Sequence, residues 1–159
     1  MCTDFTCYLG QAIGPLINIF IVFIGWSVLY GNAQKIATRS ETRGLLDRTI
    51  DKVRTLENEG KIYWLKSSKN LTSEERSIYT IRMQHELQIL EEHLQLIARR
   101  NIVINLSQDL FKFRNSTTFC SEKPERSNEL DRVLSISSRA NTICNRLEDV
   151  FISKYKPTE

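Results

Sequence analysis

The stretch IGPLINIFIVFIGWSVLY, residues 13–30, decides how the rest of the chain is organised. It holds no charged residue, and only Asn18 and Ser27 are clearly polar. A helix of this length is about 27 Å long, close to the hydrocarbon thickness of about 30 Å that a membrane span must cross. Trp26 and Tyr30 lie near its far end, where aromatic rings favour the membrane–water interface. The sequence therefore predicts a transmembrane helix over residues 12–31, with Pro15 in its first turn, preceded by an exposed tail over residues 1–11.

Two other interpretations of this stretch remain open. The first is the buried core helix of a protein that does not enter a membrane. The second is a secretory signal cleaved near Ala33, which would leave a secreted helical bundle. The small residues Gly31 and Ala33 suit a cleavage site, but no Lys or Arg precedes Lys35, whereas a signal peptide begins with a positively charged region.

The charges that flank the stretch predict its orientation. The only charged residue before it is Asp4, whereas Lys35, Arg39, Arg43 and Arg48 follow it closely. An excess of Lys and Arg marks the cytoplasmic side of a membrane span. We therefore expect the N-terminus outside and residues 32–159 in the cytoplasm, with a bacterial inner membrane as the favoured location.

Composition restricts the rest of the chain to one small domain. The 159 residues are 41% hydrophobic and 26% charged, with a net charge of +3. Basic residues beside the span are sufficient to explain that surplus, because they are attracted to anionic membrane lipid. Membrane lipid is therefore an expected partner, and direct nucleic-acid binding is not expected.

Apolar residues at intervals of three and four predict three helices, over about 34–66, 73–114 and 125–155. The second has the clearest start, because Thr72 and Glu75 fit the capping-box pattern. Its length is typical of coiled-coil-like packing. The predicted fold class is all-α: a single N-terminal transmembrane helix, then a cytoplasmic helical hairpin or three-helix bundle with long coiled-coil-like helices.

The helices predicted over residues 73–114 and 125–155 are expected to present a packing or partner face. It consists of apolar positions and one polar position: Leu87, Leu90, Leu94, Ile97, Asn101, Ile104, Leu130, Val133, Leu147 and Phe151. Asn101 has two interpretations. It is either a buried polar residue that sets the helix register, or the site of a bend or an edge of the packed face.

A second candidate surface lies within the predicted span. Intervals of four and three place Gly14, Asn18, Ile21, Gly25 and Val28 along one helix face. Small residues allow helices to approach closely, and an amide within a bilayer tends to find a partner. This association face predicts self-association or docking to another membrane protein. The alternative is that Asn18 bonds locally or reaches water.

No pattern of catalytic, cofactor-binding or metal-binding residues is present. The cysteines form no CxxC pair, and the two histidines, eight residues apart, lack the HExxH spacing of zinc proteases. We read both histidines as solvated. We therefore expect no enzymatic activity, no cofactor and no small-molecule substrate. The residues concerned are Cys2, Cys7, Cys120, Cys144, His85 and His93.

These features predict a single-pass membrane protein whose cytoplasmic helical domain binds another protein or a second copy of the chain. In layout it resembles small membrane effectors of bacterial antiphage defence systems. That resemblance implies a partner that holds the protein inactive and, on release, spans that cluster and compromise the membrane. A passive scaffold, or an accessory subunit of a larger membrane complex, is the alternative.

Overall fold

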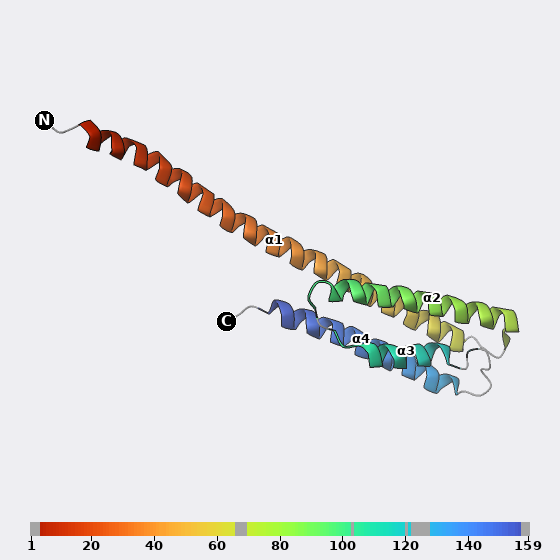
Figure 1. Cartoon of the computed structure of the whole chain (residues 1–159). Helices are drawn as coiled ribbons and strands as arrows, with labels where there is room; N and C mark the ends of the chain where they lie inside the picture. The colour runs from red at the N-terminus through yellow and green to blue at the C-terminus, as the bar shows by residue number, and fades with distance from the viewer. Residues whose placement is uncertain (1–3, 66–69, 103, 120, 122–127, 157–159) are drawn as a thin grey trace. The chain divides into compact units, whose positions relative to one another are not determined.

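The computed structural model describes residues 4–65, 70–102, 104–119, 121 and 128–156, and for residues 4–16 the backbone alone. These residues form four α-helices and no β-strand, so the predicted all-α class is confirmed for the described part of the chain (Figure 1). The chain divides into two compact units between Glu41 and Thr42. Each unit is described by itself.

Helix α1 runs from Asp4 to Leu65 and contributes to both units. The predicted tail over residues 1–11 is therefore helical from Asp4, and Pro15 lies inside the helix rather than in its first turn. Once a helix is nucleated, each added residue other than proline contributes a hydrogen bond, so a weak signal such as a single glycine does not end it. Gly60, which resembles a helix stop in the sequence, also lies within α1.

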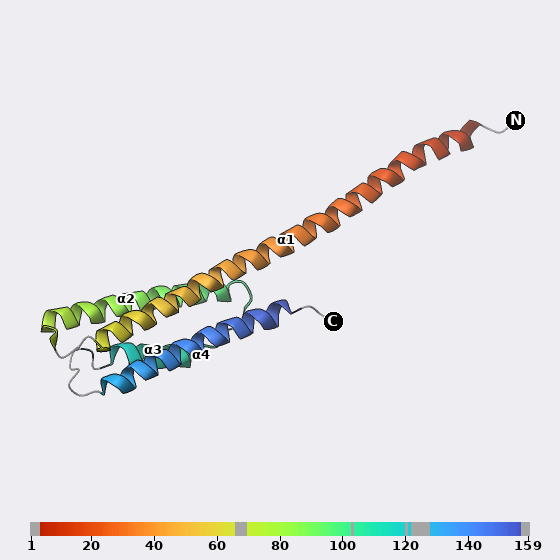
Figure 2. The same ribbon diagram turned by 180° about the vertical axis from the view of Figure 1, so that it is seen from behind.

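The second unit holds the last part of α1 and three further helices: α2 (Ser73–Ala98), α3 (Ser107–Thr118) and α4 (Glu129–Tyr155). Ion pairs Lys52–Glu86 and Arg82–Glu59 show that α2 runs antiparallel to α1. Helix α4 also runs antiparallel to α1. Arg43 binds Glu148 near one end of this pair, and Arg54 donates to Asn141 further along. Figures 1 and 2 show α2 beside α1 and α3 beside α4.

The single helix predicted over residues 73–114 is wrong, because the chain reverses within it. Helix α2 ends at Ala98, and α3 begins at Ser107 and runs back along α2. At the reversal Asn101 has φ of 58°, a left-handed conformation that asparagine tolerates better than most residues. It is exposed there, so Asn101 marks a bend and is not a buried register residue. The reversal buries Ile102 and Leu106, which are 2% and 3% exposed.

Side-chain caps define the starts of α2 and α4. Thr72 and Glu75 form the predicted capping box: Thr72 Oγ1 accepts from the Glu75 amide at 3.2 Å, and Glu75 Oε2 accepts from the Thr72 amide at 2.8 Å. Asn128 accepts from the Leu130 amide at 3.2 Å and caps α4. Residues 125–127, where this helix was expected to begin, lie outside the described residues.

One hydrophobic core joins the four helical segments of the second unit. Buried positions of α1 in this unit, among them Leu46, Thr49, Val53 and Leu56, recur every three or four residues, the spacing that the sequence pattern predicts. Trp64 and Phe113 are the largest side chains that are fully buried. The other core residues with no exposed surface are Leu46, Val53, Met83, Leu90, Ile97, Ile136, Ala140, Ile143 and Leu147.

Candidate interaction surfaces

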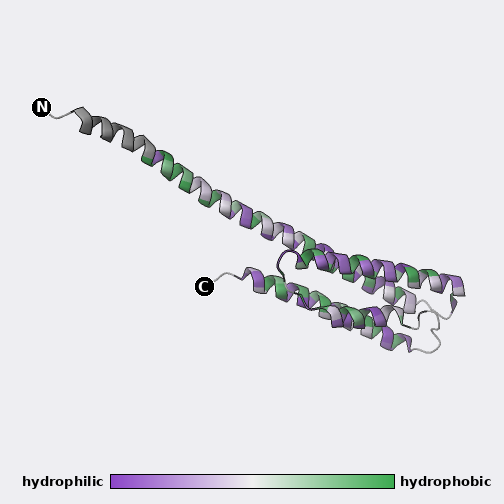
Figure 3. Cartoon of the chain, viewed as in Figure 1, coloured by the Kyte–Doolittle hydropathy of each residue, from purple (hydrophilic) through white to green (hydrophobic). Residues whose placement is uncertain are grey.

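The apolar segment, residues 17–30 of α1, exposes its large side chains. Each large apolar residue in it is between 52% and 71% exposed, and Figure 3 shows hydrophobic residues along this part of the helix. By length and composition, α1 contains a stretch that is apolar enough to cross a membrane. The Trp26 and Tyr30 rings stack at 6.4 Å near the end of the segment.

The predicted association face lies on this exposed segment. Asn18, Ile21 and Val28 are all exposed, and a Cβ added at Gly25 would meet nothing within 4 Å. The side chain of Asn18 is therefore an amide surrounded in the sequence by apolar neighbours. The position of Gly14 falls among residues whose backbone alone is described.

The predicted packing face is divided between the core and the surface. Leu87, Leu90, Ile97, Leu147 and Phe151 are buried, and Leu94, Ile104 and Val133 are partly buried against them. Leu130 is 62% exposed, and Asn101 lies at the bend. Most of this face therefore holds the unit together, which leaves Leu130 as its one large apolar residue available to a partner.

Aromatic rings close the part of the core where α1 ends. Tyr63 stacks on Tyr79 with ring centroids 3.6 Å apart, and Trp64 meets Tyr63 edge-on. The Tyr79 hydroxyl donates to the Thr117 carbonyl at 3.2 Å, and that of Tyr63 donates to the Ser121 carbonyl at 2.5 Å. Burial raises the pKa of Tyr79, so this hydroxyl stays protonated and serves as a donor. In the sequence, KIYWLK (61–66) is a short apolar patch, but it does not indicate that these aromatic rings pack together.

Charged side chains join the helices at the edge of the core. Burial by itself would raise the pKa of Glu57, but hydrogen bonds from Lys61 and Arg54 outweigh it and leave the pKa below its ordinary value. Arg146 Nη1 lies 2.6 Å from Asp109 Oδ2, which connects α4 to α3. In both pairs a cation lies beside a carboxylate at the edge of the core.

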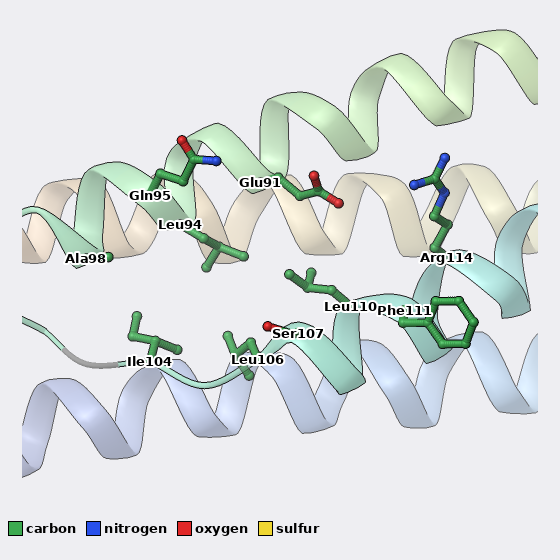
Figure 4. Close-up of a pocket in the computed structure, with 10 residues that line it drawn as sticks. All are labelled: Glu91, Leu94, Gln95, Ala98, Ile104, Leu106, Ser107, Leu110, Phe111 and Arg114. Carbon is green, nitrogen blue, oxygen red and sulfur yellow. The ribbon is translucent and has the colours of Figure 1, made fainter.

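A shallow groove of about 430 Å³ lies between α2 and α3 (Figure 4). Leu94 and Leu110 lie in it, with Phe111 at one side, and its charged lining residues are Glu91 and Arg114. No cysteine or histidine lines it. The groove therefore offers apolar contact to a side chain.

Among the described side chains, those that could bind a metal do not come together. Within the described ranges, no group of three or more His, Cys, Asp or Glu side chains could hold a metal ion. Cys144 is buried in α4, and His85 is exposed. His93, predicted to be solvated, is half-buried instead, and its Nδ1 lacks a hydrogen-bond partner. Cys2, Cys7 and Cys120 lie outside the described side chains.

No family model, no curated protein and no solved structure matches this chain.

Proposed function

We propose that residues 12–31 anchor the chain in a membrane as a single-pass protein, and that the second unit is a helical interaction domain held on the cytoplasmic side. The observation that carries this proposal is the exposure of the apolar segment. Monomeric soluble proteins rarely expose apolar patches beyond a few hundred Å². Fully burying a large apolar side chain contributes about 1.5–3 kcal/mol. Scaled by their exposed fractions, the large apolar side chains of residues 17–30 together favour lipid by roughly 10–20 kcal/mol.

Membrane fractionation with alkaline carbonate washing tests the anchor. The full chain should remain in the membrane pellet, and a Phe20→Lys, Ile24→Lys double variant should be released, because each charge at mid-span costs about 2.5–3.5 kcal/mol. Ile36→Lys is the matched control. Ile36 is 69% exposed on the same helix but outside the segment, so its variant should stay in the pellet. A native chain that is monomeric in detergent-free buffer would exclude the anchor.

Reporter fusions test the orientation separately. The proposed topology predicts that a periplasmic-type alkaline phosphatase is active when fused before residue 4 and inactive when fused after residue 156. A fluorescent protein should give the opposite pattern. Activity of phosphatase at the C-terminal fusion would place the helical domain outside.

The exposed amide of Asn18 favours one more specific role within this class, the clustering of spans proposed for a membrane-acting effector. An amide in lipid gains about 0.6–2 kcal/mol from a hydrogen-bonded partner, and a second copy of this chain offers the same group at the same depth. Depolarisation and loss of viability on expression, reduced by Asn18→Leu, would support an effector. Tolerated expression of a protein that fractionates with membranes would support the passive scaffold.

A further inference from the structure

Three segments that are far apart in the sequence, the start of α1 within this unit and the ends of α2 and α4, are tied together at one end of the second unit. The Tyr155 hydroxyl donates to Thr42 Oγ1 at 3.3 Å, which joins the end of α4 to the residue where α1 enters the unit. Lys154 Nζ donates to the carbonyls of Arg100 and Asn101 at 2.5 and 3.1 Å, which joins α4 to the end of α2. Residues 42–49, 97–101 and 148–156 therefore form a single surface, which we call the entry end.

The entry end is basic. Its three segments contain six Lys or Arg and three Asp or Glu. Two of those carboxylates, Asp47 and Glu148, already bind Arg43. The far end of the unit, residues 57–65, 72–82, 112–121 and 128–132, contains six basic and six acidic residues. The entry end thus has three more basic than acidic residues, whereas the named ranges of the far end are balanced.

Part of this positive charge is exposed and available to a ligand. Arg99 and Lys156 are both exposed, at the ends of α2 and α4 respectively. Ile152, one turn before Lys156, is 58% exposed and adds an apolar side chain beside the cations. Cations next to an exposed apolar residue are typical of surfaces that lie at the headgroup boundary of a membrane.

The short connection to the apolar segment favours a lipid surface over a nucleic acid. Residues 31–41 span about 16 Å as a helix, whatever angle the two units make. Headgroups extend roughly 6 Å beyond the hydrocarbon, and the Debye length at physiological ionic strength is about 8 Å. Lys and Arg side chains extend their charges along an apolar stem, so they reach across the remaining gap. The connection itself adds Lys35 and Arg39.

We propose that the entry end binds the anionic headgroups of the leaflet in which the chain is anchored. The chemical class of its ligand is a phospholipid with net negative charge, and the contact holds the helical domain against the membrane. This inference rests on the proposed membrane anchor. It goes beyond it by assigning a lipid-binding surface to α2 and α4, which the anchor does not require.

Hydrogen–deuterium exchange of the full chain in nanodiscs tests the contact. We expect the amides of residues 97–101 and 150–156 to exchange at least three-fold more slowly in discs with 30% phosphatidylglycerol than in pure phosphatidylcholine. The difference should disappear in 0.5 M NaCl, because salt screens the attraction. An Arg99→Gln, Lys156→Gln variant should also lose it. Lys112→Gln, Arg114→Gln is the matched control, which removes two charges from α3 and should retain it.

Four outcomes would overturn the proposal. Equal exchange in the two kinds of disc, with the chain inserted in both, would refute lipid binding and leave the anchor intact. Equal loss of protection in the control variant would mean that total charge, not the entry end, is responsible. Protection by a 20-nucleotide RNA in phosphatidylcholine discs, without protection by phosphatidylglycerol, would assign the surface to nucleic acid. If the chain enters neither disc, the proposed anchor fails and this inference fails with it.

Discussion

Substitution of two glycines in α1 by alanine should have opposite effects on stability. Gly44 is exposed, and a Cβ added there meets nothing within 4 Å. Gly60 is buried, and its Cβ would lie 3.2 Å from Ile136 Cδ1 and 3.4 Å from Thr117 Cγ2. Both residues have helical conformations, so the same substitution separates backbone preference from packing.

The expected magnitudes follow from these distances. Alanine is favoured over glycine inside a helix by about 0.5–1 kcal/mol, so Gly44→Ala should raise the free energy of unfolding by that amount. Gly60→Ala has the same backbone gain, but overpacking a core costs about 1–3 kcal/mol. We expect it to lower the free energy of unfolding by about 1 kcal/mol. The two variants should therefore differ by roughly 2 kcal/mol.

A third substitution identifies the atom responsible. Ile136→Val removes Cδ1, the atom closest to the new methyl group, and alone costs about 0.5–1.5 kcal/mol. In that background Gly60→Ala should change sign and stabilise the protein. The stability of all four variants can be measured by urea unfolding of the full chain in a non-ionic detergent, followed by the fluorescence of buried Trp64 in a Trp26→Phe background.

Two results would refute the reasoning. If Gly60→Ala stabilises the protein as much as Gly44→Ala does, α4 does not approach α1 as closely as the distances state. If Gly60→Ala destabilises equally with isoleucine or valine at position 136, the clash lies elsewhere, and Thr117 Cγ2 becomes the remaining candidate.

Three further predictions concern single side chains. The pKa of Glu57 is lowered by its cations. The contribution of Glu57 to stability is therefore complete above the ordinary pKa of 4.5 and is lost as the pH falls through the lower folded-state pKa. Glu57→Gln should flatten the dependence of the unfolding free energy on pH in that acidic window, and an unchanged slope would contradict the pairing. Asn101→Gly should be tolerated, whereas Asn101→Val should lower the free energy of unfolding by about 1–2 kcal/mol, because φ of 58° is unfavourable for a β-branched residue. Equal effects of the two substitutions on urea unfolding would argue against the bend. Burial raises the pKa of the Cys144 thiol, so peptide-level mass spectrometry should find it alkylated only as fast as the domain unfolds, and rapid labelling in the native state would show that α4 is not packed as described.

Local signals in the sequence were sufficient for much of the fold. The apolar segment is defined by composition alone, and Thr72 with Glu75 marks the start of α2 within four residues of chain. The intervals of three and four also identify part of the buried side of α4, where Leu147 has no exposed surface and Phe151 is 7% exposed. Each of these features depends on residues that are neighbours in the sequence, which is why a pattern could predict it.

The reversal between α2 and α3 was not predictable in this way. Residues 99–106 contain no Pro or Gly, and Ile102 and Leu106 continue a helical spacing. The chain turns because those two side chains are buried in a core to which α1 and α4 also contribute, and Asn101 can adopt the left-handed conformation that the turn requires. Burial in tertiary structure outweighs a helical preference of a few tenths of a kcal/mol per residue.

The same distinction separates the two candidate surfaces. The apolar segment could be recognised within the 18 consecutive residues 13–30, and its basic flank was counted from Lys35 to Arg48. The cations of the entry end include Arg99, Arg100, Lys154 and Lys156, which no sequence window holds together. Lys154 joins the end of α4 to the end of α2, so these charges act at one place only in the folded protein. Neutralising the local flank would therefore leave four of the six cations of the entry end in place.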